Sequence, residues 1–313
     1  MDRSLLAPLA AQLDGGAVVT SAELAGLGAS RTDLRRLLAT GSLERVVRGV
    51  YALRSPTPNR PEAEHRRLVL ATMRARTGRA PVVLGGPSAA VMYGLPLLAR
   101  PAPVVCAAGR TPGGTKPGRG LRTIAPPGPE GTSTLGPWKL TTPARTVLDV
   151  ARLMSTADGV AAADAALRRG LTTRAELEAA VAHLAGHAGV AQARRVVRLA
   201  DARSESPGES WSAVVIDSLG LPRPERQQPF HDEHGLIGRS DFWWPEHGVI
   251  GEFDGRVKYG RENPAGRAPE DVLWEEKRRE DRLRRRVDTV ARWTTTELRR
   301  PADLLRMLGP LLT

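Results

Sequence analysis

The sequence predicts a multi-domain α/β protein. Its 313 residues exceed what one compact core usually holds, so two or three domains are expected. Aromatic usage also changes along the chain, because five of the six Trp and all three Phe lie beyond residue 205. We therefore predict three domains, at residues 1–55, 56–200 and 205–313, with residues 201–210 as the linker and the start of a new helix.

The charge balance favours a polyanionic partner. The chain has 46 Lys and Arg against 34 Asp and Glu, which gives a formal charge of +12. Nucleic acid is the commonest polyanion for such a protein. The genome's base composition can explain the preference for Arg over Lys, but it does not explain the excess of bases over acids. We expect DNA as a partner.

Several classes of protein are disfavoured. No window holds the 18 or so consecutive apolar residues of a membrane span, so no membrane association is expected. The N-terminus is a poor signal peptide, with an early Asp2 and apolar positions at helical spacing. The single cysteine, Cys106, excludes an internal disulfide and a cysteine-based zinc site within one chain. These features predict a cytoplasmic protein.

The first 55 residues are expected to form three helices and a β-hairpin. Apolar positions follow a helical period over residues 3–13. Thr20 or Ser21 can cap a second helix, and Ser30 can cap a third. Two short strands follow, with Gly49 at the turn between them. Three helices followed by a basic hairpin are the order of a winged helix.

Five arginines occupy the positions at which a winged helix contacts the groove and the phosphates of DNA. Three lie on the third helix and two on the hairpin, and they are Arg31, Arg35, Arg36, Arg45 and Arg48. The alternative is a small helical domain whose basic face is merely solvated.

The middle region is predicted to be mixed at first and α-rich afterwards. A helix is expected over residues 61–76, a strand or loop leading into a short helix over 81–98, and a strand over 103–109. Ala-rich segments from Thr142 onward have helical character.

The last region is predicted to be an α/β domain with a central mixed sheet. Ser206 to Glu209 fits a capping box, with Pro207 at the first helical position. A strand is expected after Pro224. Two further strands, over residues 237–244 and 249–255, read as neighbours joined by a short turn.

Acidic side chains are predicted to cluster on these two strands. Glu252 and Asp254 share a strand face with Ile250, and Asp241 lies on the neighbouring strand. Carboxylates on an apolar strand are costly unless something compensates them. A hard cation such as Mg²⁺ or Mn²⁺ is one compensation, and arginine partners are the other. Asp241, Glu252 and Asp254 are thus candidate metal ligands, and such a metal can activate water for phosphodiester hydrolysis.

With these motifs in view, residues 206–298 resemble the PD-(D/E)xK restriction-endonuclease-like superfamily, in the branch of very-short-patch repair endonucleases. The resemblance rests on ES at 209–210, the paired glutamines at 227–228, SDF at 240–242, EFDG at 252–255, EKRRED at 276–281 and VARW at 290–293. It implies that Glu209, Asp241 and Glu252 fill the family's acidic positions. Asp254 stands where the superfamily has a Lys.

That departure bears on catalysis, because the Lys helps to position or activate the nucleophile in the superfamily. Lys277, on the basic segment 272–286, or Lys258 is a candidate substitute; otherwise the domain is a binder that has lost activity. Arg278 and Arg279 on the same segment are candidate phosphate contacts. The alternative is a solvated helix with ion pairs at i, i+4 spacing.

The N-terminal part, from ELAGLGASRTDLRRLLATGSLERVVRGVYAL to TPARTVLDVAR, is similar to the AbiEi family of type IV antitoxins. This resemblance implies operon autoregulation and a cognate toxin of nucleotidyltransferase type. Two functions follow. One is a DNA-binding, metal-dependent endonuclease in phage defence or a toxin–antitoxin system. The other is an antitoxin and autorepressor whose nuclease-like domain is inactive. The oligomeric state stays open.

Overall fold

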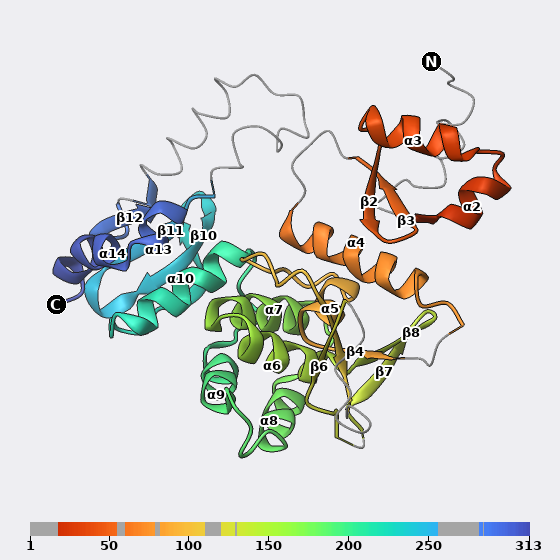
Figure 1. Cartoon of the computed structure of the whole chain (residues 1–313). Coiled ribbons are helices and arrows are strands. Elements are labelled where there is room, and N and C mark those ends of the chain that lie inside the picture. Colours follow the sequence, from red (N-terminus) through yellow and green to blue (C-terminus); the bar gives the residue numbers. More distant parts are fainter. Residues whose placement is uncertain are drawn as a thin grey trace.

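A computed structural model of the chain shows a mixed α/β protein with three sheets among the residues it describes (Figure 1). Those residues are 18–54, 60–78, 82–109, 120–128, 130–255, 282–283 and 285–313. The helix expected over residues 3–13 lies outside them, as does most of the basic segment 272–286.

The N-terminal unit is a three-stranded sheet with two helices. Its elements are β1 (Val19–Thr20), α2 (Ser21–Gly26), α3 (Arg31–Ala39), β2 (Leu43–Val47) and β3 (Val50–Leu53). The strands run in the order β1-β3-β2 and are antiparallel. The second helix, the third helix and the hairpin are thus where the sequence predicts them, whereas β1 was not expected.

The helix boundaries follow from local capping. Thr20 and Glu23 form a capping box at the start of α2, and Ser30 and Asp33 form another at the start of α3. Gly49 has φ +79° in the turn between β2 and β3, a conformation that costs glycine little. Local sequence therefore fixes this unit's elements.

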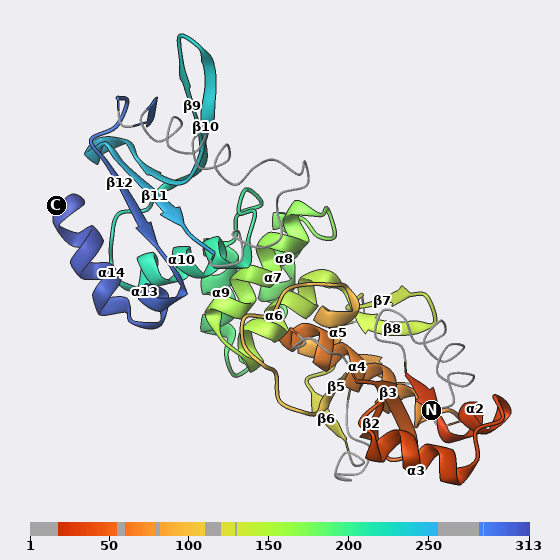
Figure 2. The same ribbon diagram turned by 90° about the horizontal axis from the view of Figure 1, so that it is seen from above.

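Helix α4 (Pro61–Arg74) packs against the hairpin and lies between the N-terminal unit and the rest of the chain in both views (Figures 1 and 2). Two ion pairs join it to the N-terminal unit: Arg67 binds Glu44 of β2 at 2.5 Å, and Arg74 binds Glu23 of α2. Helix α4 is thus a packed connection.

The middle region contains a five-stranded mixed sheet of order β6-β5-β4-β8-β7. Its elements are β4 (Val83–Leu84), α5 (Gly86–Met92), β5 (Val105–Ala108), β6 (Leu121–Ile124), β7 (Thr132–Leu135) and β8 (Trp138–Thr141). The strand at 105–108 was predicted. Strands β6, β7 and β8 were not, because their polar and apolar residues give no clear strand pattern and β7 is largely exposed.

Four helices complete this region: α6 (Pro143–Leu153), α7 (Thr156–Arg168), α8 (Arg174–Ala182) and α9 (Val190–Leu199). Small residues let them approach closely. A Cβ on Gly159 of α7 would lie 2.7 Å from both Ala151 and Val196. The Ala-rich composition read from the sequence is therefore a packing requirement of the largest apolar core.

The C-terminal unit has the mixed sheet that the sequence predicts, in the order β12-β11-β10-β9. Strands β11 and β12 are parallel and the other pairs are antiparallel. Its elements are α10 (Pro207–Ser218), β9 (Glu225–Asp232), β10 (Gly235–Trp244), β11 (Val249–Phe253), β12 (Thr289–Trp293), α13 (Thr295–Arg299) and α14 (Pro301–Leu308).

The two faces of this sheet have different environments. One face packs Phe242, Trp244 and Trp293 against residues of α10, α13 and α14. The other carries Ile250 and a smaller cluster that includes Leu283. Because side chains alternate along a strand, Asp241 and Glu252 belong to this second face.

Helix α10 also packs on α7, and its Val214 belongs to the core of the middle region. The last unit is therefore attached to the middle one through an apolar contact.

Candidate functional site

The N-terminal unit presents exposed arginines on two elements. Arg31, Arg35 and Arg36 lie on α3, while Arg45 and Arg48 lie on and just after β2, and all five are exposed. The opposite side of α3 is apolar, with Leu34, Leu37 and Leu38 in the unit's core. Helical periodicity thus separates the cationic side from the packed side.

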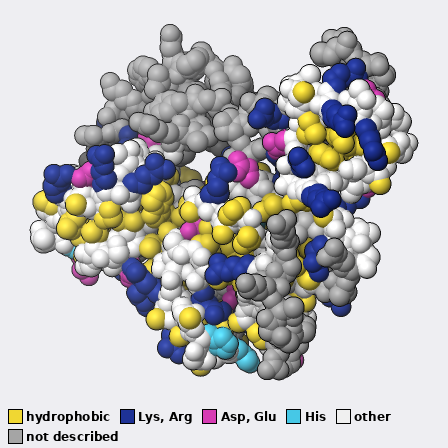
Figure 3. Space-filling view, viewed as in Figure 1, with side chains coloured by type: hydrophobic (Ala, Val, Ile, Leu, Met, Phe, Trp, Pro, Cys, Tyr) yellow, Lys and Arg dark blue, Asp and Glu magenta, His cyan; other side chains and the backbone are white. Residues whose placement is uncertain are grey.

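The acids of the same unit are already paired. Glu23 and Glu44 bind the arginines of α4, and Asp33 caps α3 and pairs with Arg36 at 2.8 Å. Among the described residues, no ion pair involves Arg31, Arg35, Arg45 or Arg48. In Figure 3, dark-blue side chains gather on the N-terminal unit, at the upper right. The surface there is net positive.

The second candidate site lies where α10, β9, β10 and β11 meet. Glu209 of α10 is 6% exposed. Ser206 caps the helix and accepts the N–H of Glu209 at 3.2 Å. The predicted capping box is only half formed, because the Glu209 carboxylate binds the N–H of Glu205 instead of that of Ser206. The Glu209 carboxylate accepts the backbone N–H of Glu205 and the side-chain amide of Gln227, each at 2.9 Å. Glu209 therefore serves both the helix start and the cluster.

Asp241 lies close to Glu209, since the carboxylates of both accept a hydrogen bond from the same side-chain nitrogen, Gln227 Nε2. Gln227 Nε2 is 3.2 Å from Asp241 Oδ1, and the other oxygen, Oδ2, accepts the backbone N–H of Phe253 at 2.8 Å. The ladder between β10 and β11 stops at the pair Phe242 and Gly251. The Asp241 carboxylate thus binds backbone that the ladder leaves free.

Glu252 and Asp254 each make a contact with β12. Glu252 Oε2 accepts from Arg292 Nε of β12 at 3.0 Å. Asp254 follows β11, and its backbone N–H donates to the carbonyl of Trp293 at 2.8 Å. The structure thus joins Glu209 to Asp241 through Gln227, and it gives Glu252 the arginine partner that the sequence offered as the alternative to a metal.

The carboxylates of this site are held by hydrogen-bond donors. Across the described ranges, no three His, Cys, Asp or Glu side chains are grouped to hold an ion. The predicted ligands Glu252 and Asp241 are engaged by N–H donors, and the Gln227 amide lies where Asp241 and Glu209 converge. Mg²⁺ or Mn²⁺ binding stays a prediction. The predicted residues Lys277, Arg278 and Arg279, and also Lys258, lie outside the described residues.

Three further residues of this neighbourhood make contacts that the sequence did not predict. Gln227 has φ +53°, and within the described chain it is the only non-glycine residue with positive φ. Asp164 of α7 and Arg226 of β9 form a buried ion pair at 3.3 Å. The paired glutamines were visible as a motif, but the Asp164–Arg226 contact joins residues 62 positions apart and has no local signal.

Comparison with known proteins gives a family for the N-terminal part. Residues 8–54 match the AbiEi antitoxin family of transcriptional regulators. Two uncharacterized Mycobacterium tuberculosis proteins, Rv2248 of strain H37Rv and MT2308 of strain CDC 1551, are 40% identical over 114 residues. These matches cover 36% of this chain and 42% of each relative, so the chain spans less than half of their length.

Among solved structures, the RV2827C protein from Mycobacterium tuberculosis aligns with a TM-score of 0.37 and 17% identity. The alignment covers 73% of this chain and 87% of that one. None of the helices in the described ranges is long and apolar enough to span a membrane. Residues 8–54 carry a domain of the AbiEi antitoxin family.

Proposed function

We propose that this protein is a DNA-binding transcriptional regulator of the antitoxin type, which contacts DNA through α3 and the β2–β3 hairpin. The observation that carries the proposal is the distribution of charge on the N-terminal unit. Its acids are paired, two of them with α4, while Arg31, Arg35, Arg45 and Arg48 are exposed and make no ion pair within the described chain.

This distribution suits a winged helix on DNA. A helix fits into the major groove, and arginines at its exposed side contact base edges or phosphates. The hairpin arginines, Arg45 and Arg48, can contact the adjacent phosphates. The pairing of Glu23 and Glu44 with α4 removes negative charge that would otherwise repel the backbone of DNA.

We further propose that the C-terminal α/β unit is a nuclease-type scaffold that binds a partner, with a nucleotidyltransferase-type toxin as the candidate. Two features of the site support a binding role over catalysis. Asp254 stands where the resembling superfamily has a Lys, and the carboxylates of Glu209, Asp241 and Glu252 are satisfied by N–H donors.

A metal-dependent endonuclease is the second candidate function. The observation in its favour is the convergence of Glu209 and Asp241 on Gln227 at the edge of the ladder between β10 and β11. Carboxylates from a helix and a strand that meet in this way are the type of ligand that metal-dependent phosphodiester hydrolysis uses.

The DNA-binding proposal is tested with charge reversal. Binding to the DNA upstream of the protein's own gene is measured by fluorescence anisotropy for the native chain, Arg35→Glu and the double variant Arg31→Glu/Arg35→Glu. We expect affinity to fall roughly tenfold or more for each reversal. The matched control is Arg306→Glu on α14, which makes the same charge change at an exposed arginine far along the chain. Equal losses in the control and the α3 variants would contradict the proposed interface.

The two functions are separated by a cleavage assay. Supercoiled plasmid is incubated with the native chain and Mg²⁺ or Mn²⁺, beside Asp241→Ala, Glu252→Ala and the control Asp303→Ala, which removes a half-buried carboxylate on α14 that is paired with Arg306. The regulator proposal expects no cutting by any of them. Cutting that both site variants abolish and the control retains would establish the endonuclease instead.

A further inference from the structure

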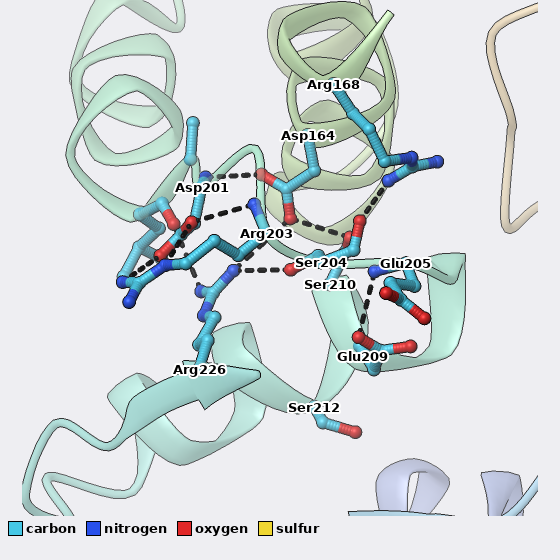
Figure 4. Close-up of polar contacts among 12 residues, drawn as sticks. Asp164, Arg168, Asp201, Arg203, Ser204, Glu205, Glu209, Ser210, Ser212 and Arg226 are labelled. Carbon is cyan, nitrogen blue, oxygen red and sulfur yellow. Dashed lines mark hydrogen bonds and ion pairs between the residues drawn. The ribbon is translucent and has the colours of Figure 1, made fainter. Parts of the chain in front are cut away.

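A buried polar network joins the middle region to the C-terminal sheet. Asp164 of α7 has no exposed surface, and its two oxygens accept from different segments. Oδ1 accepts the backbone N–H of Asp201 at 2.7 Å, and Oδ2 accepts the Ser210 hydroxyl of α10 at 2.7 Å. Figure 4 shows these groups converging with Arg226.

Arg226 is the member of this network that belongs to β9. It is 6% exposed. One terminal nitrogen donates to Ser204 Oγ at 2.7 Å and to Asp164 Oδ2 at 3.3 Å. The other donates to the carbonyl of Leu199, at the end of α9, at 3.1 Å. A buried guanidinium held by three oxygens fixes the backbone of β9 on the helices.

The residue after Arg226 is Gln227, whose backbone is strained. A non-glycine residue at φ +53° costs about 1–2 kcal/mol, and such strain persists only where the surroundings enforce it. The ladder between β9 and β10 pairs Arg226 with Phe242 and Gln228 with Ser240. Gln227 and Asp241 lie between these pairs, where the side-chain amide of Gln227 reaches both carboxylates.

We propose that the Asp164–Arg226 pair positions Gln227, so that the carboxylate cluster of Glu209 and Asp241 is assembled only while the C-terminal sheet is docked on the middle region. In this arrangement Asp164 and Arg226 are positioning residues that act through Gln227. Helix α10 contributes to both ends of the link, because Ser210 binds Asp164 and the adjacent Glu209 binds Gln227.

This coupling concerns the geometry of the cluster and is the same whether the unit binds a partner or cuts DNA. It also explains the placement of the polar groups. An ion pair buried at the junction is costly to desolvate and adds little stability over an apolar contact. The ion pair instead fixes the position of β9 against the helices. An apolar contact between β9 and α7 would allow more than one register.

The test measures Gln227 directly. In the full-length ¹⁵N-labelled chain, the side-chain amide signals of Gln227 are identified by their loss in Gln227→Glu. Their exchange with solvent is compared with that of the neighbouring Gln228, whose amide makes no hydrogen bond within the described residues. We expect exchange at Gln227 to be at least roughly tenfold slower in the native chain.

Asp164→Asn and Arg226→Met should bring the two rates together at a temperature at which circular dichroism shows a folded chain. Arg226→Lys should retain part of the protection. The matched control is Asp149→Asn, which breaks a comparable buried pair with Arg145 inside the middle region. It should destabilise the fold but leave Gln227 protected.

If Asp164→Asn does not fold, Ser210→Ala supplies the milder change, because it removes one donor to Asp164 and no charge. Fast exchange at Gln227 in the native chain would overturn the proposal. So would full protection of Gln227 in the folded Asp164 and Ser210 variants, or equal deprotection by Asp149→Asn.

Discussion

Gln227 combines an unfavourable backbone conformation with a bridging side chain. Its φ of +53° lies in the left-handed region, and its amide donates to carboxylates on two other elements. Backbone strain of this kind is common at functional sites, where a defined geometry is retained although it lowers stability. The glutamine pair at 227–228 therefore holds two residues with different roles.

The difference in stability between the glycine and the alanine variant should have opposite signs at the two glutamines. Gln227→Gly should be more stable than Gln227→Ala by about 1 kcal/mol, because glycine adopts positive φ without a Cβ penalty. Gln228 serves as the control, since its backbone is ordinary β-strand. There Gln228→Gly should be less stable than Gln228→Ala by about 0.5–1 kcal/mol. Urea unfolding of the four variants measures both differences, and the same sign at both positions would refute the strain.

His65 is buried at the start of α4. It is 5% exposed, its Nε2 lies 2.9 Å from the Ser88 hydroxyl, and burial lowers its pKa to about 4. An unfolded histidine has a pKa near 6.5. The folded chain thus binds this proton less readily than the unfolded chain does.

Stability from His65 should therefore be present above pH 6.5 and should be lost as the pH falls towards 4. The loss is about 3 kcal/mol in the free energy of unfolding. Unfolding curves of the native chain and His65→Gln between pH 4 and 7 isolate this part, because other groups titrate equally in both. Parallel pH profiles for the two proteins would contradict the prediction.

At the scale of elements, α10 connects the parts of the molecule. Its first turn packs on β11, where a Cβ on Gly208 would lie 1.9 Å from the ring of Phe253. The backbone N–H of Phe253 is also the donor to Asp241. The helix thus approaches the sheet closely at the point where the carboxylates meet.

Gly208→Ala should destabilise the protein by about 1–3 kcal/mol, since the added methyl group must displace Phe253. The matched control is Gly26→Ala in α2, where the added Cβ meets nothing within 4 Å. That change should be neutral or should stabilise by up to about 1 kcal/mol. Thermal unfolding compares the two, and an Ala at 208 that is tolerated as well as one at 26 would argue against this close contact.

The elements also show which sequence signals are reliable. Capping residues predicted the starts of α2, α3 and α10, and alternating polarity predicted β10 and β11, because both signals are local. Strands β6, β7 and β8 escaped prediction because their polar and apolar residues give no clear strand pattern, whereas β5, of the same length, is apolar and buried throughout. Short strands form when neighbours supply their hydrogen bonds, and that information is not local.

At the scale of the whole molecule, polar contacts link the three units. Helix α4 is paired with the N-terminal unit through Arg67 and Arg74, and α7 is paired with β9 through Asp164 and Arg226. Two of the three acids in the described part of the N-terminal unit, Glu23 and Glu44, are thereby paired with α4.

DNA affinity should depend steeply on salt. If the five arginines of α3 and the hairpin displace counterions, the slope of log K against log salt concentration should approach about −4.5. Arg45→Gln should reduce the magnitude of that slope by about 1. Anisotropy titrations between low and physiological salt measure it, with Arg306→Gln as the control. A flat response would remove the electrostatic basis of the proposed interface.

Local patterns in the sequence predict the winged helix with its five arginines and the neighbouring strands that carry Asp241 and Glu252. Each of these depends on a local period, a cap or a charge count. Which groups meet depends on the folded chain, which places Gln227 between Glu209 and Asp241, Arg292 beside Glu252, and Arg226 on Asp164. The physical reason is that hydrogen bonds and ion pairs are set by distance in space, and these partners lie 14 to 62 residues apart along the chain.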